Sequence, residues 1–325
     1  MADNTRFNRN NNSLEISPVY YLGKMFSALL RWLFLIAIAY VILYPLFYML
    51  SMSFRATQDF YDVTVVWVPK TFTVEHFKFI FEKLNLIKPL LLTGVITILC
   101  TLAEMIICST IGYGFARFKF KLSNILFVLV VFTIMVPPQM LNMSNYLLMK
   151  NFDIFGLIKA ITGHTSSINL LDSIWAFLLP AITGQGIRSG LMIMIFRQFY
   201  ASLPVELEEA ALIDGCGFTK TYLHIMAPNL SNTFCLCAIF SIVWYWTDYF
   251  YSLTYLPTNK NMALQIENIY EVVRTALAYV GDTSMYNMIP KQQAACLLFI
   301  LPLVIFFLII QKSFSRSIEN SGLVG

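Results

Sequence analysis

The sequence SLPVELEEAALIDGCG occupies positions 202–217 and is followed directly by FTKTYLHIMAPN at positions 218–229. Pro204 suits the first turn of a helix, and Ser202 can cap that helix from just before it. Acidic residues follow where the helix dipole favours negative charge. They are Glu206, Glu208 and Glu209. These features predict a helix that starts close to Pro204.

The second half of this stretch predicts a turn and another helix. Asp214-Gly215 is a turn signal, because glycine readily adopts the left-handed backbone that ends many helices. A second short helix is expected from about Phe218 to Met226. It should stop before Pro228, since the residue ahead of a proline is pushed out of helical geometry. By composition alone, the stretch is a structured link between two apolar segments.

The composition of the whole chain is that of an integral membrane protein. Of its 325 residues, 58% are hydrophobic and 12% are charged, and the mean hydropathy is +0.68. A soluble domain carries about 25% charged and about 45–50% apolar residues, so this chain has too little polar surface to coat a water-soluble body. The net charge of +4 argues against a nucleic-acid partner, because such proteins concentrate many basic residues on one face.

Apolar segments long enough to cross a membrane recur along the chain. A spanning helix needs about 20 mostly apolar residues, and five runs satisfy this requirement at about 27–53, 88–115, 124–148, 230–256 and 292–311. A sixth run, at about 174–199, is expected to be a broken or re-entering segment followed by a helix. Its interruptions are Pro180, Gly184, Gly186, Arg188 and Gly190. The sequence therefore predicts an all-α polytopic membrane protein with six transmembrane helices.

Basic residues gather in the links and chain ends that share one side of this arrangement, as is typical of the cytoplasmic side. They are Arg6, Arg9, Lys24, Arg31, Arg117, Lys119, Lys121, Arg197, Lys220, Lys312 and Arg316. Both termini and the 200–229 link are then cytoplasmic, in a bacterial inner (plasma) membrane. The 54–87 loop opposes this orientation with four basic residues, which four acidic residues balance. The predicted parts are a cytoplasmic tail at 1–26, a transmembrane domain at 27–311 and a cytoplasmic tail at 312–325.

The residues indicate no catalytic, nucleotide or metal site. The chain lacks the P-loop sequence that cradles phosphates. Its six cysteines lie mostly in apolar runs and form no disulfide or metal framework. The histidines are dispersed, at His76, His164 and His224. We therefore expect a non-catalytic chain that binds no cofactor.

The 202–229 stretch resembles the EAA loop of ABC importer permeases. That pattern is Glu-Ala-Ala, three residues, glycine, nine residues, isoleucine, one residue, leucine and proline. The matching residues are Glu209, Ala210, Ala211, Gly215, Ile225 and Pro228, with Ala227 in place of the leucine. In this family the loop forms a coupling helix that inserts into a cleft on an ATPase subunit. The ATPase-coupling residues implied here are Glu209, Ala210, Ala211, Asp214, Gly215, Ile225 and Pro228.

Further segments resemble the maltose-type carbohydrate uptake family, and the resemblance covers about 88–311. GYGFARFKF at 112–120 is similar to the end of the second span in sugar permeases, and Pro137-Pro138-Gln139 is similarly placed in the third. WTDYFYSL at 246–253 resembles their Trp-Asn-Asp/Glu-Phe-Leu-x-Pro-Leu motif. The tail IENSGLVG at 318–325 resembles the terminus of the shorter permease, which pairs with a longer partner.

The resemblance implies a type I ABC importer permease fold and a set of partners. These are a homologous second permease, two ATPase subunits that use ATP and Mg²⁺, an extracytoplasmic solute-binding protein, membrane lipid, and a sugar or oligosaccharide as cargo. ATPase closure would move the loop and open the pathway outward. The outer loop at about 257–291 would reach the binding protein, and the 313–325 tail would lie against the ATPases.

Two functional alternatives stay open. ABC import of a non-sugar solute would use the same loop. An ion-coupled secondary transporter would need coupling acids, and Glu104, inside an apolar run, is either such an acid or a structural residue that faces the bundle interior. Trp246, Asp248 and Tyr249 combine aromatic faces with a carboxylate and are candidates for the substrate pathway. An aromatic belt at the membrane interface explains the same residues equally well.

Overall fold

A computed structural model describes residues 18–321 except positions 63, 66, 84–85, 154–167, 280 and 282. Within this part of the chain the regular structure is helical, and β-pairing is limited to two isolated bridges, so the all-α prediction is confirmed. Most of the predicted N-terminal tail, the last four residues and His164 lie outside the described residues. The first helix starts at Pro18, inside the predicted tail at 1–26.

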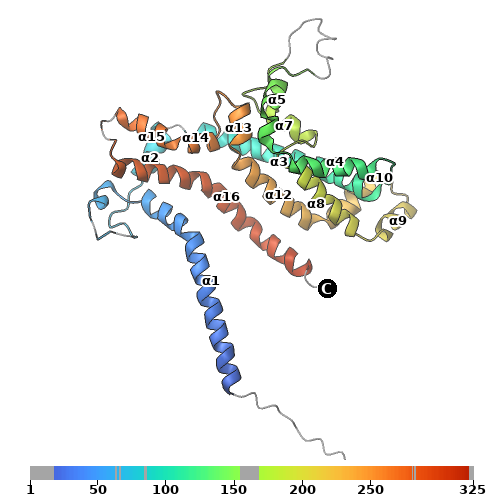
Figure 1. Cartoon of the computed structure of the whole chain (residues 1–325), viewed down its shortest axis with the longest axis horizontal. Helices are drawn as coiled ribbons and strands as arrows, with labels where there is room; N and C mark the ends of the chain where they lie inside the picture. Colours follow the sequence, from blue (N-terminus) through green and yellow to red (C-terminus); the bar gives the residue numbers. More distant parts are fainter. Residues whose placement is uncertain are drawn as a thin grey trace, which may run out of the picture.

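Figure 1 shows how the helices are arranged. In chain order they are α1 (Pro18–Ser53), the 3₁₀ turn η1 (Thr57–Phe60), α2 (Glu75–Lys83), α3 (Ile87–Arg117), α4 (Ser123–Met135), α5 (Pro138–Lys150), α7 (Trp175–Ile182), α8 (Ser189–Ser202), α9 (Glu206–Ile213), α10 (Phe218–Thr221), the π-turn η2 (Tyr222–Met226), α11 (Ala227–Asn229), α12 (Ser231–Trp246), α13 (Phe250–Tyr255), α14 (Met262–Glu267), α15 (Ile269–Ala278) and α16 (Met285–Ser321).

Helix α3 is the centre of the helical body, where it packs against α7, α8 and α12. Its buried residues recur three or four positions apart and therefore form one face. Many are small or carry a hydroxyl, including Thr93, Thr97, Cys100, Thr101, Cys108, Ser109 and Gly112. A Cβ added at Gly112 would lie 2.7 Å from Phe196 Cβ on α8. Small residues thus bring the α3 and α8 backbones together, as is common between membrane helices.

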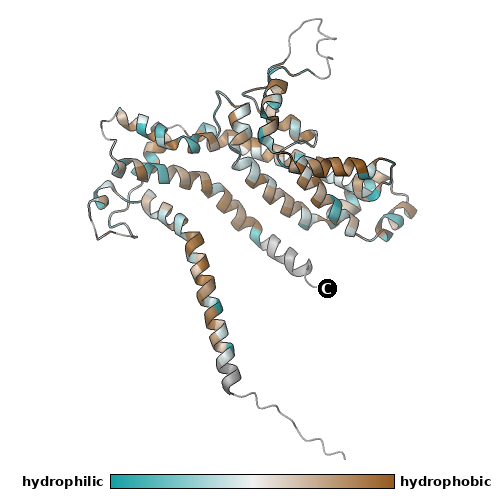
Figure 2. Ribbon diagram, viewed as in Figure 1, coloured by the Kyte–Doolittle hydropathy of each residue, from teal (hydrophilic) through white to brown (hydrophobic). Residues whose placement is uncertain are grey.

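Helix α1 is apolar over most of its length and leans away from the helical body (Figures 1 and 2). The rest of the chain buries none of its most apolar window. Its contacts with other helices are chiefly with α16. A helix that is hydrophobic on every side is typical of a membrane span.

Helices α2, α14, α15 and the start of α16 form a group at the end of the molecule opposite α9 and α10 (Figure 1). Their shared core includes Ile80, Met262, Val273, Leu277 and Met288. This group and the α9–α11 loop are therefore separated by the length of α3, which is about 46 Å for 31 residues.

Three helices in the described part of the chain are long and apolar enough to cross a membrane, at Gly23–Ser53, Ile87–Arg117 and Met285–Gln311. These confirm the first, second and last predicted spans as long apolar helices. Two bent helix pairs raise the number to five if each pair counts as one span. The total of six stays a prediction, because the run at 174–199 is divided between α7 and α8, which have 8 and 14 residues.

The predicted span at 124–148 is not one straight helix, because α4 and α5 meet at an angle of 101°. Val136 and Pro137 between them have extended backbones. A residue before proline is disfavoured in helical geometry, and proline has no N–H to continue a helix. Pro138 then starts α5, a position that suits its fixed φ.

The predicted run at 230–256 is also interrupted. Helix α12 ends at Trp246, and α13 begins at Phe250. Asp248 lies between them and accepts hydrogen bonds from Ser252 N at 2.8 Å and Ser252 Oγ at 3.0 Å. The carboxylate therefore caps the start of α13, which ends the apolar helix earlier than hydropathy indicates.

The predicted break in the run at 174–199 is confirmed, and it lies between α7 and α8. Gly184 has a φ of +74°, and Arg188 has a φ of +58°, which is uncommon for a residue with a side chain. The Arg188 guanidinium lies 4.9 Å from the ring centroid of Trp244. Gly190, expected to contribute to the break, instead belongs to α8, where a Cβ would lie 2.6 Å from Thr133 Oγ1 on α4.

Candidate functional site

The first helix of the 202–229 loop is α9, and it starts later than predicted. Ser202 is not its cap, because Ser202 ends α8 and its hydroxyl donates to the Phe199 carbonyl at 2.8 Å. Leu203 precedes Pro204 and is extended, as a residue before proline tends to be. Helix α9 therefore begins only at Glu206, whose first turn carries the three expected glutamates.

The turn after α9 is confirmed at Asp214 and Gly215. Gly215 has a φ of +79°, and a Cβ added there would meet no atom within 4 Å. Its N–H donates to the Leu212 carbonyl at 3.1 Å, and the Cys216 N–H donates to the Ala211 carbonyl at 2.9 Å. Glycine is needed here for its left-handed backbone rather than for space.

The second helix of the loop does not stop before Pro228, contrary to the prediction. It continues from α10 through the π-turn η2 and α11 to Asn229. The Ala227 N–H donates to the Tyr222 carbonyl, five residues earlier. This wider turn lets the chain pass a proline that has no N–H to donate. The Asn229 side-chain amide donates to the Ile225 carbonyl at 2.8 Å.

The predicted coupling residues lie on both arms of this helix–turn–helix. Ala211 is buried, Ile225 is half-buried, and the others are exposed, namely Glu209, Ala210, Asp214, Gly215 and Pro228. Large apolar side chains on the same loop are also exposed, including Val205, Leu212, Ile213, Phe218 and Leu223. Ile213 at the tip is 85% exposed. The loop therefore presents apolar and acidic groups that this chain itself leaves uncovered.

An ion pair joins α9 to the end of α3. Arg117 Nε lies 3.2 Å from Glu208 Oε1, and the two side chains are 8% and 16% exposed. Arg117 Nη2 also donates to the Leu203 carbonyl at 2.7 Å. In the sequence, Arg117 indicates orientation and belongs to the GYGFARFKF segment, and Glu208 is one of the acidic residues that suit the start of a helix. Each residue lies at the end of a predicted helix, but 91 positions separate them, so the sequence did not indicate that they form a pair.

A second connection joins the π-turn to α3 and α8 through hydroxyl groups. Tyr222 Oη donates to Ser109 Oγ at 3.0 Å, and Ser109 Oγ lies 2.8 Å from Tyr200 Oη. The Tyr113 ring centroid is 5.3 Å from that of Tyr200 and 5.2 Å from that of Tyr222. Both arms of the loop are thus anchored to the central helices.

Comparisons with known proteins agree with this architecture. Residues 108–320 match the family described as "Binding-protein-dependent transport system inner membrane component". The chain belongs to this family of transport permeases. The permease is 26% identical over 297 residues to Protein LplC of Bacillus subtilis (strain 168), covering 90% of this chain and 93% of LplC.

A second relative is the arabinooligosaccharides transport system permease protein AraQ of Halalkalibacterium halodurans. It is 28% identical over 305 residues, covering 92% of this chain and 98% of AraQ. Among solved structures, the permease resembles a chain of a bacterial ABC transporter involved in the import of the acidic polysaccharide alginate. The TM-score is 0.67 at 18% identity, covering 92% of this chain and 98% of that chain, so the permease shares the fold of an ABC importer subunit.

The three candidate pathway residues lie in different surroundings in the permease. Trp246 is buried, and its indole N–H donates to the Phe299 carbonyl on α16 at 3.0 Å. Asp248 caps α13, as described above. Tyr249 is 39% exposed. Of the three, the side chain of Tyr249 is the one turned outward from this chain.

Glu104 is fully buried on α3 and joins three helices. Its Oε1 accepts from Ser189 Oγ on α8 at 2.7 Å, and its Oε2 accepts from Ser241 Oγ on α12 at 2.8 Å. Ser241 Oγ also lies 3.1 Å from Thr101 Oγ1. Both carboxyl oxygens are therefore engaged by neighbouring helices, which supports the structural reading of this residue.

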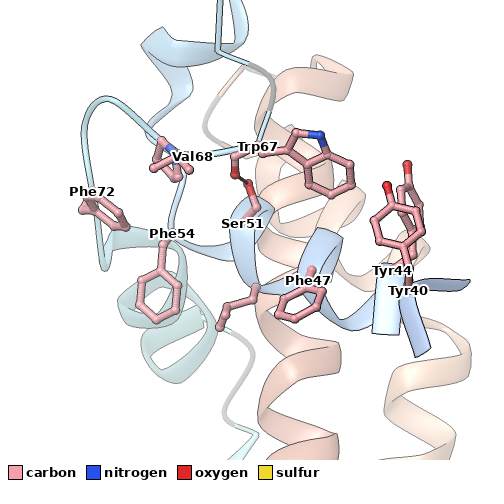
Figure 3. Close-up of a pocket in the computed structure, with 10 residues that line it drawn as sticks. Tyr40, Tyr44, Phe47, Ser51, Phe54, Trp67, Val68 and Phe72 are labelled. Atoms are coloured by element: carbon pink, nitrogen blue, oxygen red, sulfur yellow. Dashed lines mark hydrogen bonds between the residues drawn. The ribbon is translucent and has the colours of Figure 1, made fainter. Parts of the chain in front are cut away.

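A pocket with a volume of about 730 Å³ opens beside the C-terminal half of α1 (Figure 3). Its lining is apolar and aromatic, from Tyr40, Tyr44, Phe47, Leu50, Ser51, Phe54, Trp67, Val68, Pro69 and Phe72. The Tyr44 and Trp67 rings meet edge-on at 5.2 Å, and the Ser51 hydroxyl donates to the Trp67 carbonyl. The pocket lies on α1, away from the coupling loop, and its lining has no charged residue.

Proposed function

We propose that this permease is the membrane subunit of an ATP-driven, binding-protein-dependent importer for a sugar or oligosaccharide. It pairs with a homologous second permease, and two ATPase subunits bind its coupling loop and that of its partner. ATP and Mg²⁺ belong to the ATPases. A solute-binding protein delivers cargo to the outer face. The permease converts closure of the ATPases into a shift between inward-open and outward-open populations.

The single observation that carries this proposal is the helix–turn–helix at 202–229. Its predicted coupling residues are mostly exposed, its tip is apolar, and both of its arms are fixed to the central helices. A loop that only linked two spans would gain nothing from exposed isoleucine, leucine and phenylalanine side chains, whereas a docking surface needs them. The coupling residues in this proposal are Glu209, Ala210, Ala211, Asp214, Gly215, Ile225 and Pro228.

The proposed orientation places both termini and the coupling loop in the cytoplasm. Arg117, Lys119, Lys121, Arg197 and Lys220 lie in or near the links at the α9–α10 end, as the positive-inside rule requires. The group of α2, α14 and α15 at the opposite end (Figure 1) then faces outward. The predicted contact of the 257–291 loop with a binding protein falls in this group.

A carbohydrate cargo is supported by the relatives whose names state a substrate. These include permeases for arabinooligosaccharides and for polygalacturonan/rhamnogalacturonan. A non-sugar solute stays the second candidate, because a permease for sn-glycerol-3-phosphate from Yersinia pestis is 26% identical over 221 residues. The ion-coupled alternative is not retained, since the chain belongs to a binding-protein-dependent family.

Reconstitution of the complete importer tests the proposal. The permease, its second permease, the ATPases and the binding protein would be placed in liposomes and given radiolabelled arabinotriose, digalacturonate or sn-glycerol-3-phosphate. ATP-dependent uptake of either saccharide supports the proposed cargo, and uptake of the phosphate ester alone replaces it. Uptake that continues without the ATPases would contradict the ATP-driven mechanism.

A further inference from the structure

An arginine at the end of α3 reaches two other elements of the permease at once. Arg117 meets Glu208 on α9 through Nε and the Leu203 carbonyl, just after α8, through Nη2. We propose that Arg117 and Glu208 form a positioning pair that passes movement of the coupling loop to α3. This proposal rests on the proposed function, because it concerns how force from an ATPase enters the membrane domain.

The chemistry of arginine suits this position better than that of lysine. A guanidinium spreads its charge over a rigid planar fork, so Nη2 can donate to the Leu203 carbonyl while Nε keeps positive charge beside Glu208. An ammonium is a single point charge and cannot occupy both places at once. The contact between Arg117 Nε and Glu208 Oε1 lacks the alignment of a hydrogen bond, so it depends mainly on opposite charge. Both side chains are largely shielded from water, which weakens screening by salt.

Helix α9 packs against η2 and α10, but little within the helix itself stabilises it. The helix has eight residues, and its N-cap Val205 offers no side-chain acceptor. A helix this short is unstable without tertiary contacts, and Ala211 is its one buried residue. Tyr113 on α3 also makes a side-chain hydrogen bond with Glu208, and its ring packs against Tyr222 of the π-turn. The pair of Arg117 and Glu208 is therefore the charged link between the first arm of the loop and α3.

Helix α3 can carry such a displacement across the membrane domain. It is continuous over 31 residues and contacts α7, α8, α12 and α14. Gly112 lets it lie directly against the α8 backbone, so movement of its end cannot be absorbed by loose packing at that point. Loss of the pair should leave the ATPase docked but disconnect its motion from α3.

Hydrogen–deuterium exchange of the assembled importer in lipid nanodiscs tests this inference without a transport substrate. Exchange would be compared without nucleotide and after trapping with ATP, Mg²⁺ and orthovanadate. In the unmodified importer, trapping should change exchange in peptides from both α9 and α3. In the Glu208→Gln and Arg117→Gln variants, the ATPases should still co-purify, and trapping should still change deuterium exchange in α9 peptides. The trapping-induced change in α3 peptides should fall about fivefold or more.

Matched variants separate positioning from general stability. Glu206→Gln removes a carboxylate from the same helical turn, and Lys119→Gln removes a cation two residues beyond α3. Both residues are exposed. Both variants should therefore show the same exchange change in α3 as the unmodified importer. Arg117→Lys keeps the charge without the fork and should respond partially. The exchanged pair, Arg117→Glu with Glu208→Arg, should restore the α3 response.

Two results would overturn the proposal. The first is an α3 response in Glu208→Gln equal to that of the unmodified importer. The second is an exchanged pair, Arg117→Glu with Glu208→Arg, that fails to recover the exchange change in α3. If either single variant fails to assemble, the exchanged pair alone tests the proposal. If the ATPases never bind the unmodified permease, the proposed function fails instead, so the two failures are distinguishable.

Discussion

Gly112 lies on α3 directly against the backbone of α8, and its replacement should be costly. In Gly112→Ala, the new Cβ would lie 2.7 Å from Phe196 Cβ and 2.9 Å from the Arg197 backbone nitrogen. The helices must separate, which costs about 1–3 kcal/mol. Thermal unfolding of the purified permease in detergent measures this loss. Gly114→Ala is the control, because a Cβ there meets no atom within 4 Å, and equal losses for both variants would contradict the packing argument.

Gly215 offers a different test, because its surroundings within the chain are open. Gly215→Asp should abolish ATP-driven uptake while the permease is still inserted at normal levels. Aspartate and asparagine tolerate a left-handed backbone better than alanine does, and nothing in this chain obstructs a Cβ. The loss should therefore come from the docked ATPase.

Comparison with Gly215→Asn and Gly215→Ala identifies the cause of that loss. Asparagine adds bulk without charge, whereas alanine mainly adds backbone strain. Uptake and ATPase co-purification would be measured for all three. Normal transport by Gly215→Asp would refute the assignment of this turn to coupling.

Asp59 in the 54–87 loop should make local stability depend on pH. Its carboxylate accepts from Thr71 N at 2.9 Å, Thr71 Oγ1 at 2.7 Å and Lys70 N at 2.8 Å. The Thr71 backbone hydrogen bond is the main cause that holds the pKa of Asp59 below its ordinary value. A depressed pKa stabilises the folded loop above the unfolded pKa of about 4, and this contribution is lost as pH falls through the folded pKa.

Asp59→Asn should therefore lower the unfolding temperature at pH 7 by a few degrees. The difference from the unmodified permease should shrink as the pH falls below about 4. Thermal unfolding from pH 7 to pH 3 gives both values. A difference that is constant across this range would contradict a role for the ionised carboxylate.

At the scale of elements, Glu104 joins α3, α8 and α12, and its hydrogen bonds rather than its charge should matter. Glu104→Gln can still accept from one serine and donate to the other. Glu104→Leu removes the carboxyl partner of both serines, leaves Ser241 with Thr101 alone, and should cost about 1–3 kcal/mol. Unfolding temperature and ATP-driven uptake distinguish these outcomes. If Glu104→Gln were stable but inactive, a proton-carrying role would replace the structural one.

The local parts of the helix–turn–helix could be predicted, since they depend on neighbouring residues. The acidic first turn of α9 and the left-handed Gly215 follow from signals within a few positions. The predicted start of α9 was wrong because Pro204 holds the backbone of Leu203 in an extended conformation, which prevents Ser202 from capping the helix. The predicted end of the second helix was wrong because a π-turn lets the helix continue past Pro228.

Features that depend on distant residues could not be predicted from one sequence. The pair of Arg117 and Glu208 joins α3 to α9 across 91 positions of sequence, so it depends on how these helices pack. Hydropathy indicated the apolar run at 124–148 but carried no information on the 101° bend within it. Trp246 looked like an interfacial or pathway aromatic, and its contact with Phe299 requires α16, 53 positions away.

At the scale of the whole molecule, the proposed assignment of ATP hydrolysis to separate subunits makes a direct prediction. The purified permease alone should hydrolyse no ATP, because its sequence lacks a P-loop. Phosphate release would be measured with and without the ATPase subunits. Reproducible turnover by the permease alone, after removal of contaminating ATPases, would overturn the assignment of catalysis to a partner.

The lean of α1 away from the helical body has a consequence for biosynthesis. Its chief helical partner in the chain, α16, begins 232 positions after α1 ends, which takes about 10–50 s to translate. During this interval lipid surrounds the newly made α1, and its apolar side chains are stable in contact with lipid. Helix α1 is synthesised long before its partner α16, so slowing translation ahead of α16 should delay this association.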